Sequence, residues 1–163
     1  MEFWSILWIA VPVGVGCILG YVFRDYDTTL DKNITDKLKE LPKYIANAGG
    51  SIKIATDFDP KFFDDERVKK SFERALERGV KIQFLTDMEP PEWYKNKKGI
   101  EIKRVERLRR HFWVVGNGCV RLERPHKPWE FGKRKEDIGV IYKDFPKLAE
   151  IYSNEFDALW RTN

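Results

Sequence analysis

The fold is decided by a switch from helical to extended patterning in the stretch Lys43-Tyr44-Ile45-Ala46-Asn47-Ala48-Gly49-Gly50-Ser51-Ile52-Lys53-Ile54. Upstream of the switch, apolar side chains recur at the spacing of an amphipathic helix, at Ile34, Leu38, Leu41 and Ile45. We expect Pro42 to break or kink this helix and Gly49-Gly50 to end it. The apolar positions Ile52 and Ile54 then alternate with polar ones, which predicts a strand directly after the helix.

Helix and strand signals keep alternating downstream. A second helix is predicted between the acidic turn of residues 57–66 and Gly79, because acidic residues suit a helix N-terminus and glycine suits its C-terminal cap. Short apolar runs bounded by turns predict further strands at residues 80–86, 100–105, 112–115, 120–122 and 138–142. A final helix begins at Asp144-Phe145-Pro146. The sequence therefore predicts an α/β fold, with a sheet flanked by helices.

The beginning of the chain has a different character. Residues 3–23 contain no charged side chain, and as a helix they would extend about 30 Å, which is the hydrocarbon thickness of a bilayer. Lysine and arginine follow this segment but do not precede it, so we expect an uncleaved single-pass anchor in the cell membrane with the domain on the cytoplasmic side. The expected organisation is a transmembrane anchor at 1–23, a linker and helical stalk at 24–42, and one domain at 43–163.

Positive charge is concentrated in the middle of the domain. Residues 95–135 hold 14 Lys and Arg against four acids, a local net charge of +10, whereas the whole chain has +4. Such a block is typical of a surface that meets phosphate, either in nucleic acid or in anionic lipid headgroups. A solvated basic face without a ligand is the third interpretation. Cys17 and Cys119 show no spacing that suggests a disulfide, zinc or redox site.

Four stretches together resemble a known family: the helix-to-strand stretch quoted first, the joint Ala75-Leu76-Glu77-Arg78-Gly79-Val80-Lys81-Ile82, the strand His111-Phe112-Trp113-Val114-Val115-Gly116-Asn117-Gly118, and the closing Phe156-Asp157-Ala158-Leu159-Trp160. Their order resembles one half-unit of the phospholipase D superfamily, which includes small homodimeric nucleases. The resemblance implies a mixed sheet flanked by helices, a homodimer, and phosphodiester chemistry in which a histidine attacks phosphorus.

The signature of that family, H-x-K-x-x-x-x-D, is only partly present. His111 fits, but Trp113 occupies the lysine position, Gly118 occupies the aspartate position, and no G-S-x-N segment follows. Asn117 lies one place before the aspartate position. Because phosphoryl transfer needs preorganised positive donors on the phosphate oxygens, a neutral indole at the lysine position predicts a degenerate site. His111 and Trp113 are two apart on a strand, so their side chains should face the same side.

Arginines near this strand offer a substitute, because a guanidinium binds phosphate in a bidentate manner. We therefore take Arg109, Arg110, Arg121, Trp113 and Asn117 as candidate phosphate-binding residues. The candidates for contact with a polyanion are Lys103, Arg104, Arg107, Arg124 and Lys127. The acids of residues 57–66 lack the spacing of a calcium loop, so we expect neither a metal nor a cofactor.

Three functions are compatible with the sequence. In the first, a membrane-anchored, catalytically degenerate domain binds nucleic acid, anionic lipid or a protein partner. In the second, a homodimeric phosphodiesterase uses His111 as the nucleophile, with arginines in place of the lysine. In the third, the domain is a structural or signalling module held at the inner leaflet, with its basic stretch pressed onto anionic lipid.

Overall fold

The computed structural model describes residues 27–123 and 138–162, which form one mixed α/β domain. Its strands are β1 (Asp27–Asp31), β2 (Ser51–Ala55), β3 (Lys81–Thr86), β4 (Ile100–Arg104), β5 (Phe112–Val115), β6 (Cys119–Glu123) and β7 (Gly139–Lys143). Its helices are α2 (Ile34–Asn47), α3 (Pro60–Phe63), α4 (Glu66–Glu77), α5 (Glu92–Lys95) and α6 (Pro146–Thr162).

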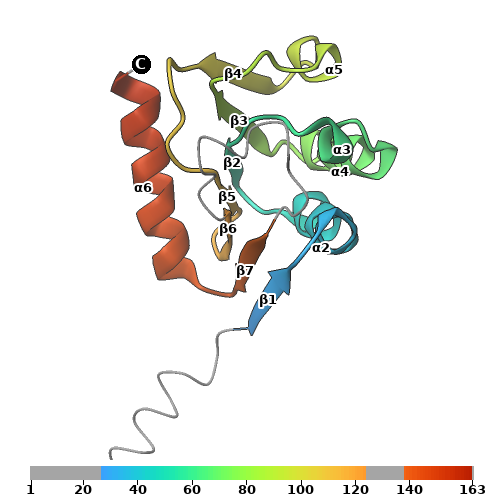
Figure 1. Ribbon diagram of the computed structural model, residues 1–163, viewed down its shortest axis with the longest axis vertical. Helices are drawn as coiled ribbons and strands as arrows, with labels where there is room; N and C mark the ends of the chain where they lie inside the picture. Colours follow the sequence, from blue (N-terminus) through green and yellow to red (C-terminus); the bar gives the residue numbers. More distant parts are fainter. Residues whose placement is uncertain (1–26, 124–137, 163) are drawn as a thin grey trace, which may run out of the picture.

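The strands form a single seven-stranded sheet with the order β1-β7-β6-β5-β2-β3-β4. Strands β2, β3 and β4 run parallel, and β5, β6, β7 and β1 continue the sheet by antiparallel pairing. Helices α2, α3 and α4 cover one face of the sheet and α6 covers the other (Figure 1). The mixed sheet flanked by helices that the sequence predicts is confirmed.

Acidic and amide side chains begin the helices, as the sequence predicts for the acidic turn. Asp59 accepts a hydrogen bond from the backbone N–H of Lys61 at the start of α3, and Asp65 caps α4. Asn33 caps α2 by accepting from two backbone N–H groups. These contacts satisfy backbone donors that have no partner inside the helix.

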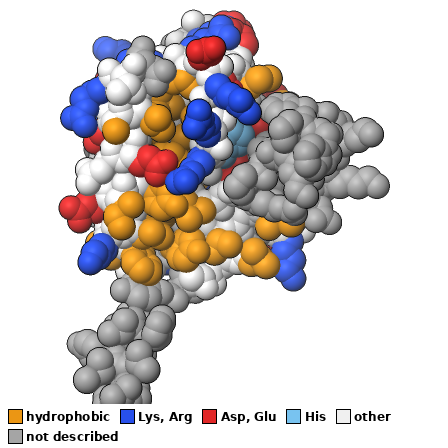
Figure 2. All heavy atoms as spheres, turned by 60° about the vertical axis from the view of Figure 1, so that its left-hand side comes forward, with side chains coloured by type: hydrophobic (Ala, Val, Ile, Leu, Met, Phe, Trp, Pro, Cys, Tyr) orange, Lys and Arg blue, Asp and Glu red, His pale blue; other side chains and the backbone are white. Residues whose placement is uncertain are grey.

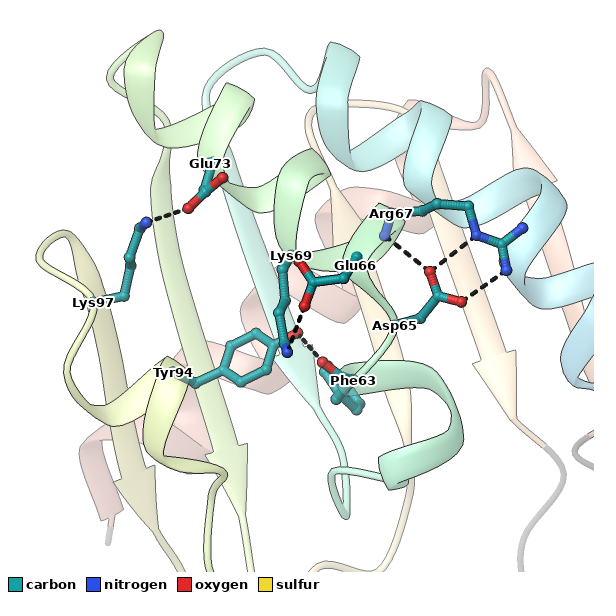
Figure 3. A network of polar contacts seen from close by, with 8 residues as sticks. All are labelled: Phe63, Asp65, Glu66, Arg67, Lys69, Glu73, Tyr94 and Lys97. Carbon is teal, nitrogen blue, oxygen red and sulfur yellow. Dashed lines mark hydrogen bonds and ion pairs between the residues drawn. The ribbon is translucent and has the colours of Figure 1, made fainter.

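Beneath α4, the core is rich in aromatic side chains. Tyr94 is fully buried and donates a hydrogen bond from its hydroxyl to the carbonyl oxygen of Phe63 at 2.9 Å. Figure 3 shows this contact below an outer row of ion pairs, among them Asp65 with Arg67 and Glu73 with Lys97. Burial of the Tyr94 phenol raises its pKa, so the hydroxyl stays protonated and keeps this hydrogen bond.

The segment expected to be a linker and stalk belongs to the domain. β1 pairs with β7 at the edge of the sheet, and Lys37, Leu41 and Ile45 of α2 are buried against the rest of the core. The folded unit therefore includes residues 27–42, which corrects the boundary expected at residue 43. Pro42 lies inside α2 without ending it, because the helix continues to Asn47.

The expected membrane anchor, residues 3–23, lies outside the described residues. Within residues 27–123 and 138–162, every helix is too short or too polar to cross a bilayer.

Candidate functional site

The antiparallel hairpin of β5 and β6 brings four chemically important side chains onto one face of the sheet. Trp113 pairs with Arg121 across the hairpin, and the backbone N–H of Glu123 donates to the carbonyl oxygen of His111 at 3.1 Å. Because side chains alternate along a strand, all four point towards the face covered by α2 and α3. The shared side predicted for His111 and Trp113 follows from this register.

A fifth residue completes a buried cluster of charges. Lys37 reaches from α2 and places its Nζ 3.4 Å from Oε1 of Glu123, and Arg121 contacts the same oxygen through Nη1. His111 lies on the other side of the carboxylate, with its Nδ1 3.3 Å from Oε2. The side chains of Lys37, Arg121 and Glu123 are at most 2% exposed, and that of His111 is 11% exposed.

Charge is concentrated around the Glu123 carboxylate. Burial alone would raise the pKa of Glu123, but the charges of Lys37 and Arg121 and the contact with His111 hold this pKa well below its usual range. Glu123 is therefore ionised, with two cationic side chains at one carboxylate oxygen and the imidazole at the other. A carboxylate on the Nδ1 side of an imidazole leaves Nε2 for chemistry or for hydrogen bonding.

Trp113 belongs to the aromatic core and not to an open pocket. Its indole is fully buried, packs edge-on against Phe62 with ring centroids 5.3 Å apart, and stacks on Phe63 at 5.6 Å. The ammonium group of Lys37 lies over the ring of Phe62 at 4.8 Å and over that of Trp113 at 5.6 Å. The indole therefore has no direct access to a phosphate, and it supplies a face for the buried Lys37 cation.

The loop between β4 and β5 carries the exposed positive charge. Since β2 and β3 lie between β4 and β5 in the sheet, this loop crosses the carboxyl ends of the parallel strands and arrives at His111. We call this side of the domain the carboxyl edge. The backbone N–H of Leu108 donates to Asp87 at 3.0 Å, and that of Val105 donates to Thr86 at 2.9 Å, so the loop is held against β3. The carboxyl ends of parallel strands are where open α/β sheets bind ligands.

A groove of about 370 Å³ lies between this loop and α6. Its apolar lining comes from Leu85, Val105, Leu108 and Leu159. Its polar lining comes from Arg107, Arg109, Arg110 and Glu155. Arg110 contacts Glu155 of α6 at 3.7 Å, whereas Arg107 and Arg109 form no ion pair within the described parts of the chain. Lys and Arg side chains gather beside hydrophobic ones on the face that carries α6 (Figure 2).

Several solved structures have a similar fold. NucT from Helicobacter pylori superimposes with a TM-score of 0.63 at 12% identity, covering 84% of this chain and 97% of that one. Nuc from Salmonella typhimurium, described as a phospholipase D family member, gives 0.59 at 14% identity, covering 84% and 95%. The chain has the phospholipase D superfamily fold. TrmBL2, an archaeal chromatin protein described as having a novel mode of DNA binding, gives 0.61 at 11% identity, covering 83% of this chain and 51% of that one.

Neither a family model nor a curated protein matches the sequence. The likeness to the phospholipase D fold thus lies in the three-dimensional arrangement.

Among the candidate phosphate-binding residues, Arg121 is brought to His111 through the shared carboxylate of Glu123, and Trp113 lies on the same face of the sheet but inside the core. Arg109 and Arg110 line the groove on the α6 side, where Arg110 pairs with Glu155. Asn117 follows the opposite end of β5 and lines a separate hollow with Gly49 and Lys143. The strand puts about 13 Å of backbone between that end and His111.

The three polyanion candidates that lie within the described residues make different contacts. Arg107 lines the groove, Arg104 contacts Glu89 at 2.9 Å, and Lys103 donates to the carbonyl oxygen of Trp160 at 2.6 Å. Arg124 and Lys127 lie outside the described residues. Within the described ranges, no group of three His, Cys, Asp or Glu is arranged to hold a metal ion.

Two residues of the charge cluster were missed from the sequence, Lys37 and Glu123. Lys37 of α2 brings its ammonium group to 5.6 Å from the ring of Trp113, the position where the family resemblance implies a lysine. The spacing of Lys37 with Leu41 and Ile45 along α2 would have indicated that Lys37 is buried. The register of the β5–β6 hairpin would have placed Glu123 opposite His111.

Proposed function

We propose that this chain is a membrane-anchored domain that binds nucleic acid at the carboxyl edge of its sheet and does not hydrolyse it. The observation that carries the proposal is the buried cluster: Lys37 and Arg121, two cations that share a carboxylate with His111, both contact Glu123. Phosphoryl transfer requires positive donors aimed at the phosphate oxygens, and a cation held by a buried carboxylate is poorly placed for that role.

Exposed charge at the same edge supports binding. Residues 103–110 contain five cations and one acid, and Arg107 and Arg109 are exposed. Guanidinium groups bind phosphate through two parallel hydrogen bonds, and a row of them suits a repeating phosphate backbone. The DNA binding described for TrmBL2, which has a similar fold, agrees with this proposal.

The place where the anchor joins the domain favours nucleic acid over lipid. Residues 24–26 span at most about 14 Å between the apolar segment and Asp27, so the start of β1 stays near the membrane. Asp27 pairs with Lys143 at one end of the strands. Because β1, β7, β6 and β5 pair antiparallel in that order, His111 lies at the opposite end of the strands.

The groove also lies far from β1 across the sheet. The groove includes Leu85 of β3, and five strand spacings separate β1 from β3, or about 24 Å, which is about three times the Debye length of about 8 Å at physiological salt. Arginines at that distance gain little from lipid headgroups of the membrane that holds the anchor, so a ligand in solution is the better match.

The test is binding of a fluorescent oligonucleotide by the full chain reconstituted in zwitterionic vesicles, measured as a function of salt. We expect affinity to fall steeply with salt, and the slope of log affinity against log salt to become shallower by about 0.7 for each groove arginine changed to glutamine in Arg107→Gln and Arg109→Gln. Lys39→Gln, an exposed lysine of α2, removes the same charge away from the groove and should leave the slope unchanged.

Adding anionic lipid to the same vesicles separates the two ligands. The proposal predicts that the oligonucleotide stays bound. Displacement of the oligonucleotide by lipid of the same membrane, with the effect lost in the Arg107→Gln variant, would instead assign the basic edge to headgroups.

A second candidate function is an active phosphodiesterase, and the contact between His111 and Glu123 favours it. A carboxylate at Nδ1 can orient an imidazole for attack through Nε2, and the same carboxylate is contacted by two cationic side chains. This alternative predicts a covalent phosphohistidine on the peptide that contains His111, together with turnover of a generic phosphodiester that disappears in His111→Ala. The homodimer implied by the family resemblance stays a prediction for both functions, and sedimentation of the full chain in detergent tests it.

A further inference from the structure

We infer that the ligand is single-stranded nucleic acid, held with an unstacked base in the groove between the β4–β5 loop and α6 and with its phosphates on Arg107 and Arg109. This inference rests on the proposed nucleic-acid binding and names the form of nucleic acid. The volume of about 370 Å³ lies within the range of small-molecule sites, so the groove has room for one planar base.

The two kinds of lining match the two parts of a nucleotide. The floor is aliphatic, from side chains such as Leu108 and Leu159, and gives an apolar contact to the face of a base. The rim carries exposed guanidinium groups, which attract phosphate and can stack on a base. A surface that only followed a phosphate backbone would need the rim and no aliphatic floor.

The apolar floor is what selects against a duplex. In double-stranded nucleic acid the flat faces of the bases are stacked on one another, so a duplex can offer the groove its charged backbone and base edges but not the face of a base. A single strand exposes its bases, and recognition of single strands commonly combines a cationic track with surfaces on which bases stack.

The shape of the groove is fixed by the fold. Asp87 accepts a hydrogen bond from the backbone of Leu108 at 3.0 Å, and the contact of Arg110 with Glu155 at 3.7 Å ties the loop to α6. Such preorganisation lowers the entropy that a flexible loop would lose on binding.

The experiment uses the full chain in a mild detergent and two DNA probes with equal numbers of phosphates: a single strand of about 16 nucleotides, the upper end of common single-strand site sizes, and a hairpin duplex. The single strand carries 2-aminopurine, whose fluorescence rises when it leaves the base stack. We expect the single strand to bind about tenfold or more tightly than the duplex at equal salt, with a rise in 2-aminopurine fluorescence on binding.

A variant then tests the floor. Leu108→Gln should weaken single-strand binding about five- to tenfold while leaving duplex binding and the salt slope unchanged, because the phosphate contacts remain. Leu148→Gln, a partly buried leucine of α6 outside the groove, is the matched control and should have no effect on binding. The comparison of the two probes on the unchanged chain needs no variant to fold.

The possible results test the single-strand inference and the proposed nucleic-acid binding separately. Equal affinity for both probes with unchanged 2-aminopurine fluorescence would overturn the single-strand inference and leave the proposed function standing. Failure of both probes to bind would overturn the proposed function itself.

Discussion

Replacing Glu123 by glutamine tests whether the charge cluster holds the site together. The substitution keeps the shape of the side chain but removes the negative charge that Lys37 and Arg121 share, and both cations are almost fully buried. Breaking a buried ion pair by removing one partner typically costs about 3–5 kcal/mol, and here one carboxylate faces two cations. We therefore expect Glu123→Gln to lower the free energy of unfolding by about 3–5 kcal/mol.

Removing one cation should lower the free energy of unfolding by a smaller amount. In Lys37→Met, Arg121 still faces the carboxylate and the new apolar side chain lies against the rings of Phe62 and Trp113, so we expect a loss of about 1–2 kcal/mol. An exposed ion pair is the control. Lys43 contacts Glu40 at 3.3 Å with 62% of its side chain exposed, and Lys43→Met should change the stability by less than about 0.5 kcal/mol.

The assay is urea unfolding of the full chain in a mild detergent, followed by tryptophan fluorescence and circular dichroism to check that the two transitions coincide. Because the pKa of Glu123 is lowered in the folded state, its contribution is complete above the unfolded pKa of about 4.3 and is lost as the pH falls towards the folded value. The difference between the parent and Glu123→Gln should therefore be constant above about pH 5 and shrink in more acidic buffer. A loss below about 1 kcal/mol at neutral pH would refute the reasoning, since it would mean that the cations do not depend on this carboxylate.

Three further changes test local features. Gly116 has a φ of +62°, and a Cβ there would lie 2.9 Å from the carbonyl oxygen of Gly49. Gly116→Ala should therefore lower the free energy of unfolding in urea by about 1–3 kcal/mol, whereas Gly49→Ala, with open space around it, should be nearly neutral. Equal effects of the two variants would contradict the close approach. Burial raises the pKa of the Cys119 thiol to about 12, so in a Cys17→Ser background a thiol reagent at pH 8 should react only once the domain unfolds, and rapid labelling of the folded chain would show that the thiol is accessible. Asn33→Ala should lower the stability by about 1 kcal/mol through loss of the α2 cap, and Asn33→Asp should retain most of it; no difference between the two variants would exclude the cap as the cause.

Periodicity and turn chemistry predicted the elements whose stability comes from burial. β5 spans Phe112–Val115 as expected, and α6 begins directly after Asp144-Phe145 because Pro146 suits the first turn of a helix. β1 was missed because only Leu30 among Asp27–Asp31 is apolar. Such a strand is determined by its partner β7, which no local pattern encodes.

The charge cluster was missed for a different reason. Lysine is usually exposed, so Lys37 was counted with the basic residues that follow the apolar segment. Yet Lys37, Leu41 and Ile45 are spaced four residues apart and form the buried stripe of α2. This spacing predicts that Lys37 is buried, but a charged side chain is normally expected on the surface.

Glu123 was within reach of a simple symmetry argument. The glycines Gly116 and Gly118 flank Asn117 at the hairpin turn, and counting outward from Asn117 pairs position 113 with 121 and position 111 with 123. Positions 117 and 118 also fall on the family motif, where Gly118 stands at the aspartate position, although in the structure they form the turn that leads into β6. Long-range contacts of α2 with this hairpin had no counterpart in the sequence.

The most direct test of the central claim is to mix the full chain with an end-labelled single-stranded oligonucleotide at low salt and to follow bound fraction and strand length in the same samples over time. The account predicts that the oligonucleotide becomes bound and is recovered at its original length, in the parent and in His111→Ala alike. Shortened strands that accumulate with the parent and not with His111→Ala would contradict it.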